Sequence, residues 1–231
     1  GLFTGVAAAG VATLATATGR RGLAGPAVAL AAGGLLGAAC FLSYGLVLLA
    51  LVPAAVLVVT RRWWLAPIAL LGVAAVTGGF AAAGFWWPDG YHLVVQRYHQ
   101  GIASHRPYGY WVLADLACLV ASAGPAAAAA LRRALTTMVG PLWSSLGATP
   151  ARRPGGPASH RWVLLPLAAA VAMLGADLSG LSKAEVERIW LPFAVWLMAG
   201  TPLLPAADRR RWLAVQAATA LVVNHLLLTG W

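Results

Sequence analysis

Charged residues are scarce in this chain: Asp, Glu, Lys and Arg together make up 10% of its 231 residues. Soluble globular domains carry about 25% charged residues. Apolar residues account for 61% of the sequence, and the mean hydropathy is +0.78. This composition excludes an ordinary soluble domain and predicts a polytopic membrane protein, for which the lipid bilayer is the solvent.

Cysteine is also rare, and the two thiols, Cys40 and Cys118, both lie inside apolar runs. We interpret them as small core residues, so the sequence predicts neither a disulfide nor a cysteine metal site. A phosphate-cradling glycine loop of the kind that nucleotide enzymes use is missing too. The sequence begins without Met and without a basic segment before its first apolar stretch. We therefore expect an N-terminally truncated fragment and not a signal peptide.

Apolar segments of membrane-crossing length recur along the chain. A spanning helix needs about 20 apolar residues, and residues 24–60 exceed this, so we expect a hairpin of two short spans there, with its turn near Ser43-Tyr44-Gly45. The predicted fold is all-α, a single polytopic transmembrane helix bundle over residues 1–231 with about eight spans. The segments are 3–18, 24–60 (two spans), 64–85, 110–131, 162–178, 190–206 and 212–229.

The basic residues are distributed unevenly between the two sides of this predicted topology. Of the 16 Lys and Arg residues, all but four lie in short clusters on one side. Cytoplasmic loops carry the excess of Lys and Arg, so we predict a multi-pass plasma-membrane protein with its active face external and no nucleic-acid partner. The segment 134–161, with an interfacial piece at 134–146, is then a cytoplasmic connector. The four external cations are Arg97, Arg106, Lys183 and Arg188.

The predicted outer loop at 86–109 combines aromatic, basic and histidine side chains. Beyond Asp89, the residues His92, Gln96 and His99 lie on one face, and apolar and aromatic residues recur at helical spacing on another: Tyr91, Val94, Val95, Tyr98 and Ile102. This is the pattern of an amphipathic helix lying in the membrane interface. The helix either only anchors the chain among the headgroups, or it presents Arg97 and the histidines to a lipid-linked phosphate, whose oxygens suit the planar guanidinium group.

Arg106 and Asp115 follow in the next stretch. Pro107 pushes Arg106 toward an extended conformation, which predicts a stiff turn where Arg106 either holds a phosphate or extends into the headgroups. Asp115 lies within a predicted span, where an ionisable group is paired or faces a cavity. We expect Arg106 or Lys183 to be its partner, and both a structural ion pair and direct chemistry remain open.

A second polar motif precedes the seventh predicted span. Ser182 and Glu185 have the spacing of a helix capping box, which explains these two residues without any function. Lys183 and Arg188 lie beside Glu187 in the same motif. A site for the phosphate of a lipid-linked donor would explain why these charges gather at the external face, and we expect this turn to lie close to the cations of the outer loop.

Three stretches together resemble the later part of the GT-C class of membrane glycosyltransferases, in particular actinobacterial mannosyl-, arabinofuranosyl- and methylthioxylose transferases. They are GGLLGAACFLSYGLVLL, WWPDGYHLVVQRYHQGIASHRPYGYW and SGLSKAEVERIWLPF. The resemblance implies a polyprenyl-phosphate sugar donor, a cell-envelope glycan or glycolipid as acceptor, and catalysis on the outer face by a carboxylate base and phosphate-binding cations. These families carry a catalytic Asp in their first outer loop, whereas no acidic residue precedes Asp89 here.

Within this interpretation the polar residues of the outer segments receive candidate roles. The catalytic candidates are Asp89, Asp115 and Glu187. The donor phosphate-binding candidates are Arg97, Arg106, Lys183 and Arg188. The candidates for a substrate groove are His92, His99, His105, Tyr108 and Asp177. No ligand spacing demands a metal, so no metal site or cofactor is assigned, and a divalent ion is left open.

Two other classes of function are compatible with the composition. A membrane transporter or lipid flippase would need charged or broken-helix sites near the bilayer midplane and an internal repeat. This chain shows no repeat, and its charges lie at the outer edge of the predicted spans. A non-catalytic membrane scaffold would leave the cluster of polar groups at the outer face without an explanation.

Overall fold

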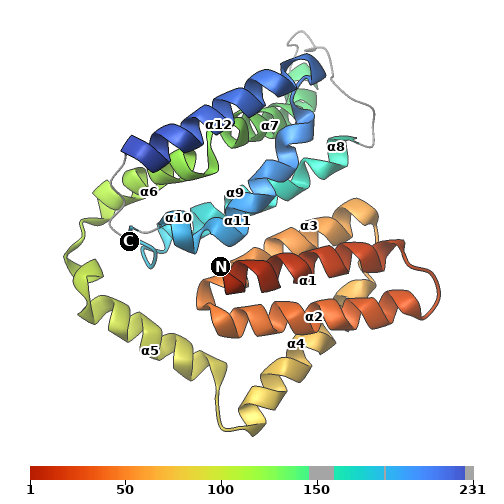
Figure 1. Cartoon of the computed structure of the whole chain (residues 1–231). Coiled ribbons are helices and arrows are strands. Elements are labelled where there is room, and N and C mark those ends of the chain that lie inside the picture. The colour runs from red at the N-terminus through yellow and green to blue at the C-terminus, as the bar shows by residue number, and fades with distance from the viewer. Residues whose placement is uncertain (146–158, 185, 227–231) are drawn as a thin grey trace.

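The computed structural model describes residues 1–145, 159–184 and 186–226, and every regular element in them is a helix. The predicted all-α fold is confirmed for this part of the chain. In Figure 1, α1 to α4 form the lower group of helices, the elements from α6 onward form the upper group, and α5 connects the two. The long helices are α1 (Leu2–Gly19), α2 (Ala24–Leu42), α4 (Leu65–Ala82), α5 (Trp87–Gln100), α6 (Tyr108–Ala123), α7 (Pro125–Ser145), α9 (Leu164–Leu178) and α12 (Arg209–Leu226).

Short helices connect or extend these elements. The predicted hairpin turn is confirmed, because α2 ends at Leu42 and a 3-10 helix begins at Tyr44. The short elements are η1 (Tyr44–Ala50), α3 (Leu51–Thr60), η2 (Ile102–His105), α8 (Ser159–Trp162), α10 (Val186–Ile189), α11 (Leu191–Leu197), η3 (Met198–Leu203) and η4 (Ala206–Asp208).

Small residues allow α2 to pack closely against α4. A Cβ atom at Gly33 would overlap the backbone carbonyl of Ala69, and one at Gly72 would overlap the carbonyl of Leu30. Such contacts are typical of membrane helices, whose association depends on close van der Waals packing. A Cβ atom at the adjacent Gly34 would meet nothing within 4 Å, so this contact does not require glycine at position 34.

The main hydrophobic core lies where α1, η1 and α3 meet α9 and α11. Its largest side chain is Trp190, which is 1% exposed at the start of α11. Leu49, Val52 and Met173 are buried in the same cluster. This core joins the lower and upper groups of helices, so the segments that flank it are held in a defined relation to each other.

Three helices, α1, α2 and α4, are each long and apolar enough to cross a membrane. The pair α6 and α7 would be a fourth if the two are counted as one bent span. Shorter apolar helices occupy Tyr44–Thr60, Leu164–Leu178 and Leu191–Leu203. The structure therefore supports three or four of the predicted spans by length and composition.

The predicted span at 110–131 is not one continuous helix, because the helix is broken at Gly124. The axes of α6 and α7 differ by 108°, and Gly124 has a φ of +81°, a conformation that favours glycine. Pro125 follows, and proline disfavours helical backbone in the residue before it. The side chain of Gln216 closes the break, since it donates to the Ala123 carbonyl at 2.8 Å and accepts from the Ala126 N–H at 3.2 Å.

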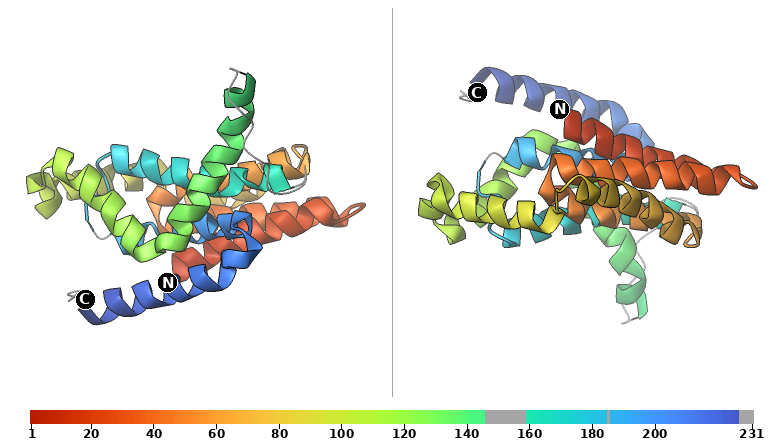
Figure 2. Two further views of the ribbon diagram at one scale, coloured as in Figure 1. Left: turned by 90° about the horizontal axis from the view of Figure 1, so that it is seen from above. Right: turned by 90° about the horizontal axis from the view of Figure 1, so that it is seen from below.

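The connections between helices gather at two opposite ends of the molecule. The α1–α2 and α3–α4 turns lie together at the right of Figure 1, whereas α10 and the α5–α6 connection lie at the left. Figure 2 shows that α12 lies on one side of the bundle and that α7 projects from the other. The arginine pair at 20–21 and Arg61 belong to the right-hand turns, and Arg61 itself adopts left-handed backbone with φ of 56°.

Candidate functional site

The N-terminal end of α5 is fixed by an aromatic seam. The Trp87 indole Nε1 donates to the Cys40 carbonyl at 3.0 Å, and its ring stacks on Tyr91 with the ring centroids 5.6 Å apart. Gly90 lies directly beneath Tyr44 and Phe85, where any Cβ atom would collide with their rings. These contacts connect the start of α5 to the C-terminal end of α2.

The connection after α5 is held by a reciprocal pair of hydrogen bonds between Arg106 and Lys183. We call these two residues the clasp. The guanidinium of Arg106 donates to the carbonyl of Lys183 at 2.5 Å, and the Lys183 ammonium donates to the Arg106 carbonyl at 3.2 Å. The same ammonium lies 3.5 Å from the Ala103 carbonyl. The prediction that the outer-loop cations and the Lys183 turn lie close together is confirmed for Arg106.

The link between α9 and α10, residues 179–184, and the end of α9 are hydrogen-bonded to α5, to α6 and to the segment between these two helices. Tyr98 accepts from the Lys183 N–H at 2.9 Å, and the Tyr108 hydroxyl donates to the Leu178 carbonyl at 2.9 Å. Gly180 and Ala184 both have a φ of +67°. This conformation is rare for alanine, so the link folds as a tight turn that depends on its neighbours.

The predicted capping box at Ser182 is wrong. The Ser182 hydroxyl donates back to the Ala176 carbonyl at 3.1 Å, and helix α10 begins at Val186. The positive φ of Ala184 is incompatible with a helical first turn over these positions. Ser182 therefore ties the link to the end of α9, and the cap partner proposed from the sequence, Glu185, lies outside the described residues.

Asp115 is 2% exposed, and its Oδ1 accepts a hydrogen bond from the Ala184 N–H at 3.1 Å. The expected pairing with Arg106 or Lys183 does not appear among the hydrogen bonds of these two cations in the described chain, which go to backbone carbonyls. The physical reason is the left-handed turn at Ala184, which has a backbone N–H without a helical acceptor. A buried carboxylate satisfies that donor, and it stabilises the turn that holds Lys183.

Asp177, at the end of α9, is 4% exposed, and neither of its carboxylate oxygens has a hydrogen-bond donor among the described residues. Burying a carboxylate without donors costs several kcal/mol if it is charged. Native structures hold few such groups, and a protonated acid, a water or a ligand usually accounts for each one. Asp177 is therefore the described polar group whose environment is least satisfied.

The clasp keeps a positive field although its side chains are engaged. Neither Arg106 nor Lys183 forms an ion pair with a carboxylate within the described part of the chain. The Arg106 guanidinium also lies over the Trp111 ring, 5.1 Å from its centroid, which is a cation–π distance. Both groups carry more N–H donors than these bonds use, so the clasp can still bind an anion such as a phosphate.

The remaining sequence candidates are not brought into the clasp. Arg188 lies on α10 and is exposed, and Glu187 belongs to the same helix, although its side chain lies outside the described residues. Among the residues that the structure describes, no group of three or more His, Cys, Asp or Glu side chains could hold a metal ion. Five further candidates are exposed on or beside α5, and none of them has a hydrogen bond to the clasp among the described residues: Asp89, His92, Arg97, His99 and His105.

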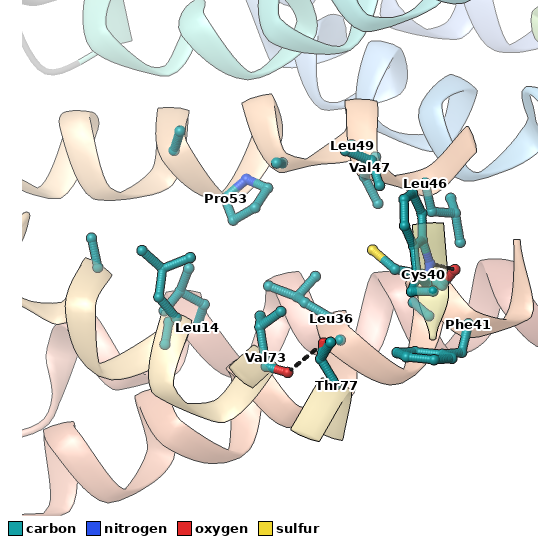
Figure 3. Close-up of a pocket in the computed structure, with 18 of the residues that line it drawn as sticks. Leu14, Leu36, Cys40, Phe41, Leu46, Val47, Leu49, Pro53, Val73 and Thr77 are labelled. Atoms are coloured by element: carbon teal, nitrogen blue, oxygen red, sulfur yellow. Dashed lines mark hydrogen bonds between the residues drawn. The ribbon is translucent and has the colours of Figure 1, made fainter. Parts of the chain in front are cut away.

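Two cavities adjoin this region. The apolar chamber has a volume of about 480 Å³, and side chains of α3, such as Pro53, face those of α2 and α4, such as Leu36 and Val73, across it (Figure 3). The aromatic chamber, of about 530 Å³, lies between α5 and the ends of α9 and α11. Its polar and aromatic lining residues are Ser43, Tyr44, Trp87, Tyr91, Tyr98, Ser179, Ser182, Trp190 and Phe193.

Sequence reasoning missed the roles of Tyr98 and Trp87. It assigned Tyr98 to the membrane-anchoring face of a helix, whereas its hydroxyl accepts from Lys183 and its ring lines the aromatic chamber. It assigned no site role to Trp87, whereas this ring lines both chambers. Helical spacing did place Tyr91 and Tyr98 on one face, and that shared face was the available signal.

Comparison with protein-family models, with curated proteins and with solved structures found no match to this chain.

Proposed function

We propose that this chain is part of an integral membrane glycosyltransferase of the GT-C type, as its sequence resemblance implies. In this proposal it transfers a sugar from a polyprenyl-phosphate donor to a cell-envelope glycan or glycolipid on the external face of the plasma membrane. The observation that carries the proposal is the clasp, a pair of cations without carboxylate partners in the described chain, next to a chamber lined by hydroxyls and aromatic rings.

The proposed topology has eight short spans and an interfacial α5. It is supported by the arginine-bearing turns between α1 and α2 and between α3 and α4, which lie at one end of the molecule, opposite to the clasp region (Figure 1). The positive-inside rule makes the first end cytoplasmic and the clasp external. In this arrangement α5 lies along the headgroups, and the pair α6 and α7 enters the membrane as a bent element.

The proposed reaction is a direct displacement at the anomeric carbon of the donor sugar. The acceptor hydroxyl oxygen forms the new bond, the bond to the lipid phosphate breaks, and a carboxylate takes the hydroxyl proton. Arg106 and Lys183 stabilise the charge that develops on the departing phosphate. The sequence candidates for the base are Asp89, Asp115 and Glu187, and the donor-free oxygens of Asp177 add a fourth.

Replacement of Arg106 in the full-length enzyme tests the proposal. Arg106→Ala should lower sugar transfer about a hundredfold, because one stabilising donor at a developing oxyanion contributes roughly 3 kcal/mol. Arg106→Lys should restore part of the activity, since it returns the charge without the planar geometry. The measurement is transfer from a polyprenyl-phosphate donor, normalised to protein that stays monodisperse in detergent.

Arg188→Ala is the parallel variant, and Arg132→Ala, an exposed change on α7, is the matched control. The control should keep full activity. If Arg106→Ala lowers only the yield of folded protein and leaves the activity per folded molecule unchanged, the clasp has a purely structural role and the proposal loses its main support.

A transporter or flippase is the second candidate, and the helix break at Gly124 favours it. Broken helices surround substrate sites in many transporters because they expose backbone groups inside the membrane. Here Gln216 already occupies the exposed carbonyl of Ala123 and the N–H of Ala126. Gln216→Leu would free both groups, so it should alter lipid or solute flux into proteoliposomes if this break is a transport site, and leave flux at background otherwise.

A further inference from the structure

The two chambers adjoin at one aromatic residue. Trp87 lines both of them, together with Leu46 and Val47. Its indole is fixed in place by the hydrogen bond to the Cys40 carbonyl and by stacking on Tyr91. A ligand that occupies both chambers therefore has to pass a rigid ring at a defined position.

The apolar chamber suits a hydrocarbon chain. No charged side chain belongs to its lining in the described chain, and the hydroxyl of Thr77 donates to the Val73 carbonyl of its own helix. A polar group that is already hydrogen-bonded does not bind a water molecule well, and apolar cavities without polar partners stay dry. Leu36, Leu49 and Pro53 point into this space (Figure 3).

The aromatic chamber has a different chemistry, with one donor that lacks an acceptor. Trp190 lines this chamber and is 1% exposed. Its indole N–H has no hydrogen-bond acceptor among the described residues. A buried donor without an acceptor is costly. A ligand oxygen that reaches this N–H would satisfy it. The clasp is connected to the chamber through Tyr98, which lines the chamber and accepts a hydrogen bond from the backbone N–H of Lys183.

We propose that the two chambers bind one single-chain lipid phosphate of the polyprenyl type, with its hydrocarbon chain in the apolar chamber and its oxygen-rich head in the aromatic chamber. The order of environments along the path is apolar, aromatic with hydroxyls, and cationic at the clasp, which matches a single amphiphile with an anionic head. This inference rests on the proposed function in taking that lipid as the sugar donor. Trp87 then marks the boundary between head and chain.

Photolabelling tests this placement without any sugar transfer. The probe is a polyprenyl phosphate with a diazirine within its hydrocarbon chain, added to the protein in nanodiscs, and the labelled residues are mapped by mass spectrometry. Label is expected in Leu36–Phe41, Leu46–Leu57 and Ala66–Thr77, where the apolar chamber is lined. Unlabelled polyprenyl phosphate should abolish it, and bulk phospholipid should not.

Two variants sharpen the test. Ala54→Trp fills the apolar chamber from an exposed position of α3, and should lower labelling about tenfold, the factor expected for displacing two methylene groups. Ala74→Trp, on an exposed position of α4 outside the lining, is the matched control and should not change it. Trp190→Phe removes the donor and should weaken binding between about twofold and tenfold.

Label spread over the outward faces of α9 and α12, or label that bulk phospholipid displaces equally well, would overturn the inference. Because mapping on the unaltered chain needs no variant, a misfolded Ala54→Trp protein does not decide the result. Specific labelling of the chambers without sugar transfer would keep the lipid site and reject the glycosyltransferase. Sugar transfer by the full-length enzyme without label in the chambers would keep the glycosyltransferase and reject the lipid site.

Discussion

Arg106 and Lys183, which are 77 positions apart, each donate a side-chain hydrogen bond to the backbone carbonyl of the other. This reciprocity couples the turn after α5 to the link before α10. It also gives both cations a structural role that is independent of any ligand. The clasp can bind a phosphate only with the donors that remain, so its structural and chemical contributions have to be measured separately.

The first prediction concerns the stability that the clasp contributes. Lys183→Met keeps a long apolar side chain but removes the donor to Arg106, so it should lower the free energy of unfolding by about 1–3 kcal/mol. The double variant with Arg106→Ala should cost less than the sum of the two single changes, because both bonds hold the same pair of segments. Thermal unfolding in detergent measures this, and strict additivity would show that the two bonds act independently.

The second prediction concerns the contact between α2 and α4. Gly33→Ala should destabilise the protein by about 1–3 kcal/mol, since the new methyl group overlaps the Ala69 carbonyl and forces the helices apart. Gly34→Ala is the control from the next position of α2, where an added Cβ atom meets nothing within 4 Å. It should be neutral or slightly stabilising, because alanine favours helix over glycine. Equal thermal shifts in both variants would exclude the proposed close packing.

Sequence reasoning succeeded where composition and charge decide the outcome. The all-helical architecture follows from the apolar segments, and the turn at Ser43 was located by the excess length of residues 24–60. The approach of Arg106 to Lys183 followed from placing the few external cations around one site. These features depend on the pattern of residue types, which a single sequence contains.

The misses depend on geometry between distant residues. Gly124-Pro125 is a helix-breaking dipeptide, but it lies in an Ala-rich run whose hydropathy favours a continuous span. Asp115 was expected to pair with a cation because charge is the strongest partner visible in a sequence. Asp115 also accepts a hydrogen bond from the N–H of Ala184. That donor is available because the link folds with a positive φ at Ala184, and no local sequence pattern predicts this conformation for alanine.

The third prediction concerns the topology of the two segments that form the clasp region. In a variant with Cys40 and Cys118 replaced by Ala, single cysteines at Gln96 and Ile189 should both react with an impermeant reagent in intact cells. Both positions are exposed, and both belong to the proposed external side. Gly90 is unsuitable as a labelling position, because it packs beneath Tyr44.

Arg21→Cys in the α1–α2 turn is the internal control for this labelling, since the proposed topology makes that turn cytoplasmic. It should react only after the cells are permeabilised. Protection at one of the two external positions together with labelling at the other would exclude a shared external face, and the clasp could not then be an extracellular phosphate site.

The fourth prediction separates two roles of Asp115. Its Oδ1 accepts the Ala184 N–H, and an asparagine at this position can accept the same hydrogen bond through its amide oxygen. Asp115→Asn should therefore destabilise the protein less than Asp115→Ala, which leaves that N–H unsatisfied and should cost about 1–3 kcal/mol. Ala184→Gly should stabilise the protein by about 1 kcal/mol, since glycine adopts this positive φ without strain.

The activity of the same Asp115 variants distinguishes positioning from catalysis. A carboxylate that is 2% exposed and holds a backbone N–H acts on the link, and through the link on Lys183 of the clasp. We therefore expect Asp115→Asn to keep most of the sugar transfer by the full-length enzyme, and Asp115→Ala to lose activity in parallel with stability. A stable Asp115→Asn variant with transfer reduced by about a hundredfold or more would contradict this and identify Asp115 as the general base, because an asparagine cannot accept the proton of the acceptor hydroxyl.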